Sequence, residues 1–287
     1  MKRRRDLGRR RRSRWIQQIE TQQRLIQYNK WLPHIHVDFH EQGVNSPYYF
    51  APAAEPIHES ITNFQRSFQD IIAKNHAKYF DTNGWFYYTK ERFDLLYPSY
   101  GDSYPSFLGA IGMTYEQAGG GRAGLGLKNG EGIELTLIDR IDHHYTTSIS
   151  TVEIASKNIK KLNIAYQEFY KNKSTKYKNF VLSGNRDRIE KLKKLLDRHQ
   201  ITYGSPNSNL KVKGFDFNSK KEKSIKLKPD NLVVSTNQVK GKMVHVLFEP
   251  QTFLSDSLTY DITAWALPYA FGLKALATKE NIDLKIN

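Results

Sequence analysis

Apolar residues recur at helical spacing before Pro33 and at every second position after it. This change of period restricts the fold more than any other feature of the sequence. Apolar residues before Pro33 recur at helical spacing, which predicts an amphipathic helix over residues 15–32. They are Trp15, Ile19, Ile26 and Trp31. Residues 34–40 then alternate polar and apolar side chains, as in a strand with one buried face. The chain must therefore combine helices with strands, and we expect an α/β fold.

The rest of the chain repeats these two periods. We expect further helices at residues 60–74 and 186–199 and a strand at 110–116. One long helix, packed along one side, is predicted by Ile141, Tyr145, Ile149, Val152, Ile159, Leu162, Tyr166 and Phe169. Near the C-terminus we expect strands at 180–182, 210–217, 224–227, 231–235 and 243–248, and a final helix at 261–276.

Composition divides the chain into three parts. The 287 residues are 39% hydrophobic and 13% aromatic, which is enough for a large core. Residues 1–14 carry +8 of the net charge of +15, so we expect a disordered basic head. Residues 171–178 are rich in Lys, Asn, Ser and Thr, as in a linker. We therefore expect a first folded domain over residues 15–172 and a smaller α/β domain over 173–287.

Several classes of protein are excluded by composition. Without cysteine, disulfides and thiolate chemistry are impossible, and a metal would have to be bound by His, Asp or Glu. No apolar run approaches the roughly 18 residues of a membrane span. No apolar segment follows the basic head, so the sequence shows no signal peptide. The head could bind phosphates or anionic lipid as a non-catalytic arm, but no nucleic-acid motif accompanies it, and we do not expect nucleic acid as a partner.

The polar face of the expected strand at 34–40 carries a possible metal site. His34, His36, Asp38 and His40 alternate along it, and imidazole and carboxylate groups can share a metal ion. This cluster alone is compatible with a metallohydrolase or with ordinary solvent-facing strand residues.

A longer stretch resembles a known family. The segments DFHEQGVNSPYYFAPAAEPIH, from Asp38, and FDTNGWFYYTKERFDLLYPSYGDSYPSFLGAIGMTYEQAG, from Phe80, resemble the second half of the catalytic domain of large bacterial zinc carboxypeptidases of the carboxypeptidase A type. The resemblance covers residues 15–170. It implies His40 as a zinc ligand, Glu116 in the sequence MTYE as the general base, and Tyr97 in the sequence YPSYGDS as a substrate-contacting residue. Tyr100 and Tyr104 are alternatives to Tyr97.

The resemblance implies a zinc metallopeptidase that releases C-terminal residues from peptide or protein substrates and that is exported or periplasmic. The family's first two zinc ligands form an HxxE pair, and no His here is followed by Glu at that spacing. We therefore expect an N-terminally truncated chain that holds catalytic Zn²⁺ poorly by itself. Glu55 and His58 have the reversed spacing, which we interpret as loop packing.

The region from Tyr177 onward resembles the accessory domain that follows the peptidase in these proteins, with an amidotransferase-like α/β pattern. Amidotransferase chemistry needs a cysteine nucleophile, which this chain lacks. We expect this region to be structural or to position substrate.

Overall fold

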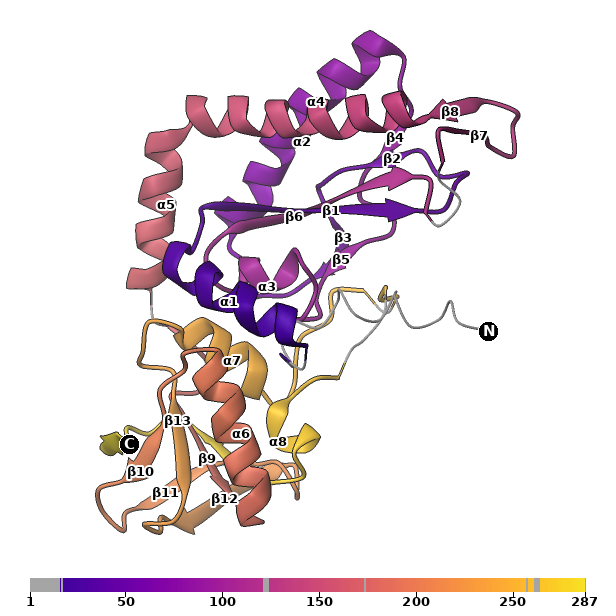
Figure 1. Ribbon diagram of the computed structural model, residues 1–287. Helices are drawn as coiled ribbons and strands as arrows, with labels where there is room; N and C mark the ends of the chain where they lie inside the picture. The colour runs from indigo at the N-terminus through magenta and orange to yellow at the C-terminus, as the bar shows by residue number, and fades with distance from the viewer. Residues whose placement is uncertain are drawn as a thin grey trace.

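Figure 1 shows a computed structural model with an N-terminal part above a C-terminal part. The structure describes residues 16, 18–120, 124–172, 174–256, 258–260 and 264–286. The expected basic head and Trp15 lie outside the described residues. The chain is a mixed α/β protein, as expected.

The N-terminal part is built on a four-stranded sheet with the order β1-β6-β2-β4. Strands β1 (Ile35–Gln42) and β6 (Ile111–Ala118) run parallel and pair along their whole length. The shorter strands are β2 (Tyr48–Tyr49), β3 (Ala54–Ile57), β4 (Tyr87–Tyr88), β5 (Asp94–Leu95), β7 (Gly126–Lys128) and β8 (Glu134–Thr136). The strands expected at 34–40 and 110–116 are both present.

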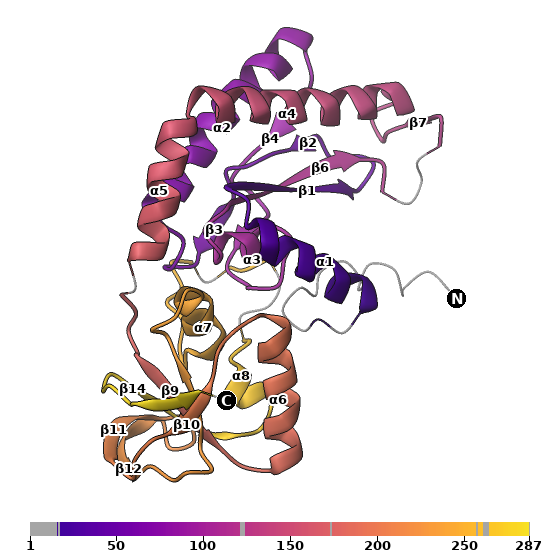
Figure 2. The same cartoon turned by 60° about the vertical axis from the view of Figure 1, so that its left-hand side comes forward.

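Helices cover both faces of this sheet. Figures 1 and 2 show α2 (Asn63–Asn83) and α4 (Leu137–Lys157) on one face, and α1 (Ile19–Trp31) and α3 (Ser103–Ser106) on the other. Helix α5 (Ile159–Lys171) follows α4 after a sharp change of direction.

Helix α2 has well-defined signals at both ends. Thr62 forms a capping box with Gln65, in which Gln65 N donates to Thr62 Oγ1 (3.2 Å) and Thr62 N donates to Gln65 Oε1 (2.9 Å). The helix ends at Gly84, whose φ of 68° is readily adopted by glycine. It therefore continues well beyond residue 74, where the sequence predicts its end.

The prediction of one long helix packed by its apolar stripe is wrong. The helix breaks at Asn158, and α4 turns most of the predicted stripe toward solvent, with Tyr145 and Val152 each 64% exposed. The buried face of α4 is polar instead: it contains Arg140, His143, Thr147, Ser150 and Thr151. These residues find hydrogen-bond partners beneath the helix, such as Tyr115 OH to Thr151 Oγ1 at 2.7 Å. Satisfied polar groups can be buried at little cost, so this face packs inward.

The C-terminal part contains a seven-stranded sheet that is antiparallel at every pairing, with the order β12-β11-β14-β9-β13-β10-β15. Its helices are α6 (Arg186–Arg198), α7 (Gly241–Phe248) and α8 (Leu267–Ala270). Its strands are β9 (Asn179–Ser183), β10 (Gly204–Pro206), β11 (Lys211–Asp216), β12 (Lys221–Lys226), β13 (Leu232–Ser235), β14 (Lys274–Thr278) and β15 (Leu284–Ile286).

Two predicted elements of this part are wrong. Residues 243–248 lie in helix α7 rather than in a strand. Apart from His245 the segment is apolar, and a short apolar run fits either structure. Over residues 264–276, the described part of the helix expected at 261–276, the helix is limited to α8, because Gly272 follows it at a φ of 58° and β14 begins at Lys274. The helix expected at 186–199 is confirmed as α6.

One hydrophobic core joins the two parts of the chain. It includes Leu25, Tyr104 and Phe107 from the N-terminal part and Leu195, Val244 and Phe248 from the C-terminal part. Tyr104 OH also hydrogen-bonds His199 Nδ1 at 2.9 Å across the junction. The domain boundary expected between residues 172 and 173 remains a prediction. The parts of the chain before and after this boundary pack against each other. None of the described helices is long and apolar enough to cross a membrane.

Candidate functional site

The parallel pairing of β1 and β6 places His40 beside Glu116. The register pairs these two residues directly, near the carboxyl ends of both strands. Paired residues of neighbouring strands point to the same face of a sheet, so the two side chains meet. His40 Nδ1 lies 3.6 Å from Glu116 Oε1. His40 and Glu116, which the resemblance singles out, are 76 residues apart in the sequence. The fold nevertheless places them side by side.

Asp38 orients the His40 ring. It lies two residues earlier on the same strand, and its Oδ2 is 3.1 Å from His40 Nε2. Burial opposes ionisation of Asp38, but the hydrogen bond and charge of His40, together with His36 and Arg24, hold the pKa of this carboxyl below its usual value. Asp38 is thus a carboxylate that accepts the Nε2 proton, and Nδ1 is the ring atom on the side of Glu116.

The group lies in a small cavity of about 30 Å³, enough for roughly one water molecule. Tyr100, Asp102 and Thr114 also line it. Burial, with a smaller contribution from the charge of Asp38, raises the pKa of Asp102 to about 6, although the hydrogen bond from Thr114 Oγ1 at 2.8 Å opposes this shift. The pocket therefore holds one carboxyl group with a lowered pKa, Asp38, and one with a raised pKa, Asp102. Such perturbed pKa values are common at functional sites.

A glycine allows the pocket wall to approach the strand. A Cβ atom at Gly101 would overlap the carboxylate of Asp38. The loop of residues 97–102 can therefore pack directly against β1 only with glycine at this position.

Tyr97 does not line this cavity, whereas Tyr100 does. The Tyr97 ring is buried and packs edge-on against Tyr100, with centroids 5.1 Å apart, and near Trp265. Ser103 Oγ donates to the Tyr97 carbonyl oxygen and holds this part of the loop. The role of Tyr97 remains a prediction, and the geometry favours its alternative, Tyr100.

His34 and His36 pack against aromatic rings. His34 stacks on Tyr166 with centroids 4.2 Å apart, and His36 meets Tyr28 edge-on at 5.6 Å. Residues four apart on an extended strand are separated by roughly 13 Å, so His36 and His40 cannot share one metal ion. The four-residue cluster on this strand does not converge as a metallohydrolase site would require.

The described residues of the pocket do not make a complete zinc site. Catalytic zinc usually has three protein ligands, and the pocket offers one imidazole, His40, beside carboxylates already engaged with it. Within the described part of the chain, the one group of three converging ligands lies elsewhere and consists of Glu59, His245 and Glu249.

Glu55 and His58 do not act together. Glu55 is at the surface, near Arg66 and Ser255, whereas His58 is buried and its Nε2 lies 2.6 Å from Glu249 Oε1. The interpretation of this spacing as loop packing agrees with these contacts. The neighbouring group of Glu59, His245 and Glu249 is absent from the sequence predictions. Its one sequence signal is the four-residue spacing of His245 and Glu249, which is informative only on a helix.

Comparisons of the chain with protein-family models, with curated proteins and with solved structures found no match.

Proposed function

We propose that the pocket around His40 and Glu116 is part of a hydrolytic site of the zinc carboxypeptidase type, which cleaves the last peptide bond of a peptide. The observation that carries the proposal is the in-register pairing of His40 with Glu116 at the carboxyl ends of two parallel strands. A general base must lie within reach of its water, and the small cavity beside Glu116 gives that water a place.

The roles of this chain's side chains follow from their contacts. Glu116 is 3% exposed, so its carboxylate is poorly solvated and can accept a proton from a water in the cavity. Asp38 holds His40 with Nδ1 toward that place. Tyr100 closes the pocket and can contact a bound peptide. Zinc, when bound, would polarise the scissile carbonyl, and His40 is the imidazole that the pocket offers it.

Peptide hydrolysis at added zinc tests the proposal. The substrate is an N-blocked dipeptide, and the readout is the C-terminal residue released by the purified protein. Glu116→Gln should lower the rate by about 10²-fold or more, the scale of a positioned general base. Glu41→Gln is the matched control, because Glu41 is an exposed neighbour on the same strand as His40. Equal rates for wild type and Glu116→Gln, or a rate that Glu41→Gln lowers as much as Glu116→Gln does, would refute the proposal.

A further inference from the structure

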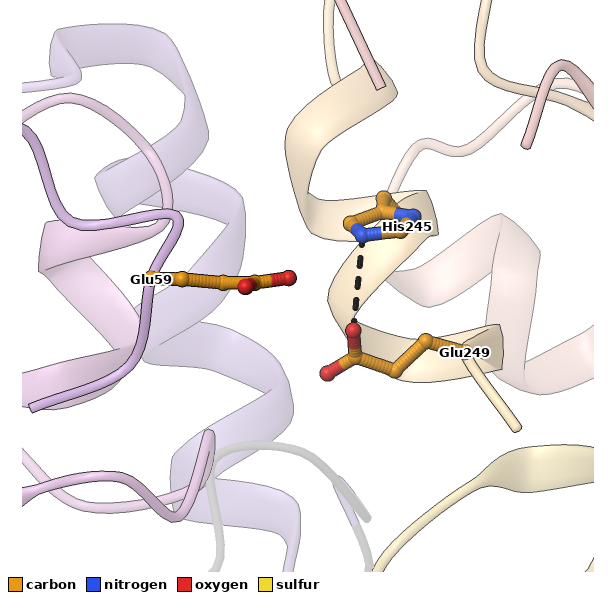
Figure 3. A group of neighbouring side chains, drawn as sticks. All are labelled: Glu59, His245 and Glu249. Carbon is orange, nitrogen blue, oxygen red and sulfur yellow. Dashed lines mark ion pairs between the residues drawn. The ribbon is translucent and has the colours of Figure 1, made fainter. Parts of the chain in front are cut away.

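Three potential metal ligands meet where the two parts of the chain pack together. Figure 3 shows Glu59 reaching from the N-terminal part toward His245 and Glu249, which belong to α7 and its C-terminal end. One ligand atom from each residue lies within 4.8 Å of the other two. Residues 59 and 245 are far apart in sequence, so only the packing of the two parts creates this group.

The helical spacing of α7 brings two of the ligands together. His245 and Glu249 are four residues apart and lie on one side of the helix, with His245 Nε2 3.4 Å from Glu249 Oε2. Both side chains are buried, with residue exposures of 4% and 3%. Glu59 is exposed, which gives an ion a route in from solvent.

The other oxygen of Glu249 is already occupied by hydrogen bonds. Ser60 N donates to His58 Nδ1 at 3.0 Å, so His58 carries its proton on Nε2 and donates it to Glu249 Oε1 at 2.6 Å. Thr252 Oγ1 donates to the same oxygen at 2.6 Å. These contacts fix the carboxylate and leave Oε2 facing His245, the kind of supporting hydrogen bonds that hold metal ligands in place.

The charges of the group favour a cation. The His245 ring turns Nε2 toward Glu249, whereas its Nδ1 is buried without a hydrogen-bond partner among the described residues, so Nε2 is the nitrogen offered to an ion. Among the ion pairs of the described part, none joins Glu59 or Glu249 to a Lys or Arg. The ion-pair partners of Glu249 are the imidazoles of His58 and His245, so two carboxylates meet here without a Lys or Arg to balance their charge.

We propose that Glu59, His245 and Glu249 bind a divalent first-row transition-metal ion that links the two parts of the protein. One imidazole nitrogen and two carboxylate oxygens suit Zn²⁺ or Mn²⁺ better than Mg²⁺ or Ca²⁺, which prefer oxygen ligands alone. Three protein ligands leave further coordination positions to water. The site is independent of the pocket at His40, and its ion would stabilise the folded chain by binding only when both parts are packed.

Titration with Zn²⁺ tests this site in the whole protein. Calorimetry should show one equivalent bound, and added Zn²⁺ should raise the unfolding temperature. Glu59→Gln should weaken binding at least about 10-fold and reduce the rise in unfolding temperature. Because Glu59 is exposed, this variant should fold like the wild type. Glu55→Gln is the matched control: it changes an exposed glutamate on the same segment that is not in the group, and should bind like the wild type.

Other variants and ions separate this site from alternatives. The His40→Ala variant should still bind one equivalent of Zn²⁺. If this variant lost the bound Zn²⁺, the ion would belong to the pocket at His40, and the proposal would be overturned. Mg²⁺ binding as tight as Zn²⁺ binding would also overturn it, because the imidazole would then contribute nothing. So would unchanged Zn²⁺ affinity in Glu59→Gln, or no saturable binding by the wild-type protein.

Discussion

Replacing Asp102 by asparagine should change the stability of the protein in a way that depends on pH. Relative to the wild type, the variant should be more stable at neutral pH than it is at acid pH. Asp102 is 4% exposed, and its pKa of about 6 lies above the ordinary value of 3.8. Its Oδ1 accepts from Ser103 N at 2.7 Å, and its Oδ2 accepts from Thr114 Oγ1 at 2.8 Å. Asparagine keeps the first contact and can keep the second if the Thr114 hydroxyl becomes the acceptor.

The magnitude follows from the pKa difference. A carboxyl whose folded-state pKa is raised contributes stability that is fully present below the unfolded pKa and is lost as pH rises through the folded value. For Asp102 the window is therefore about pH 4 to pH 6, where the unfolded chain releases the proton first. Two pKa units correspond to about 3 kcal/mol, of which about 2.5 kcal/mol should be lost between about pH 4 and about pH 7.5.

Urea unfolding at the two pH values measures this effect. The free energy of unfolding of Asp102→Asn minus that of the wild type should be more positive by about 2.5 kcal/mol at the higher pH, which means that the variant gains stability relative to the wild type. Asp70→Asn is the control, because Asp70 is a half-exposed carboxylate paired with Lys90 at 3.2 Å. A difference that does not change with pH would show that Asp102 is not held in a desolvated site, and would refute the reasoning.

Further substitutions test the pocket and its supports. In the hydrolysis assay, Tyr100→Phe should lower kcat/KM more than Tyr97→Phe, since Tyr100 lines the cavity; the reverse order would favour the assignment made from the resemblance. Thr62→Ala removes the N-cap of α2 and should cost about 1 kcal/mol in urea unfolding, whereas an unchanged midpoint would mean that the cap is dispensable. Gly112→Ala would place a Cβ atom on the Asp102 carbonyl oxygen, so the free energy of unfolding should fall by roughly 3 kcal/mol. A Gly112→Ala protein as stable as the wild type would show that the backbone at Asp102 can move aside.

The two candidate sites differ in how much the sequence reveals of them. His40 and Glu116 each lie near the end of a strand with a readable alternation, and two parallel strands that pair in register bring these positions together. The family resemblance then singled out this pair. The group at Glu59 had no such support, because its members come from a loop and from α7, which the sequence pattern presents as a strand. On a strand, residues 245 and 249 would lie roughly 13 Å apart, so their metal-ligand spacing is visible only once the segment is known to be helical.

Local periodicity by itself determined the mixture of helices and strands and the positions of β1, β6 and α6. These properties depend on neighbouring residues, whose spacing the sequence records directly. The tertiary structure decided which face of α4 is buried, that 243–248 is helical, and that Glu59 meets His245. Each of these depends on partners distant in the chain: a polar helix face can be buried when the opposing side chains satisfy it, and an apolar run takes the form that fits its neighbours.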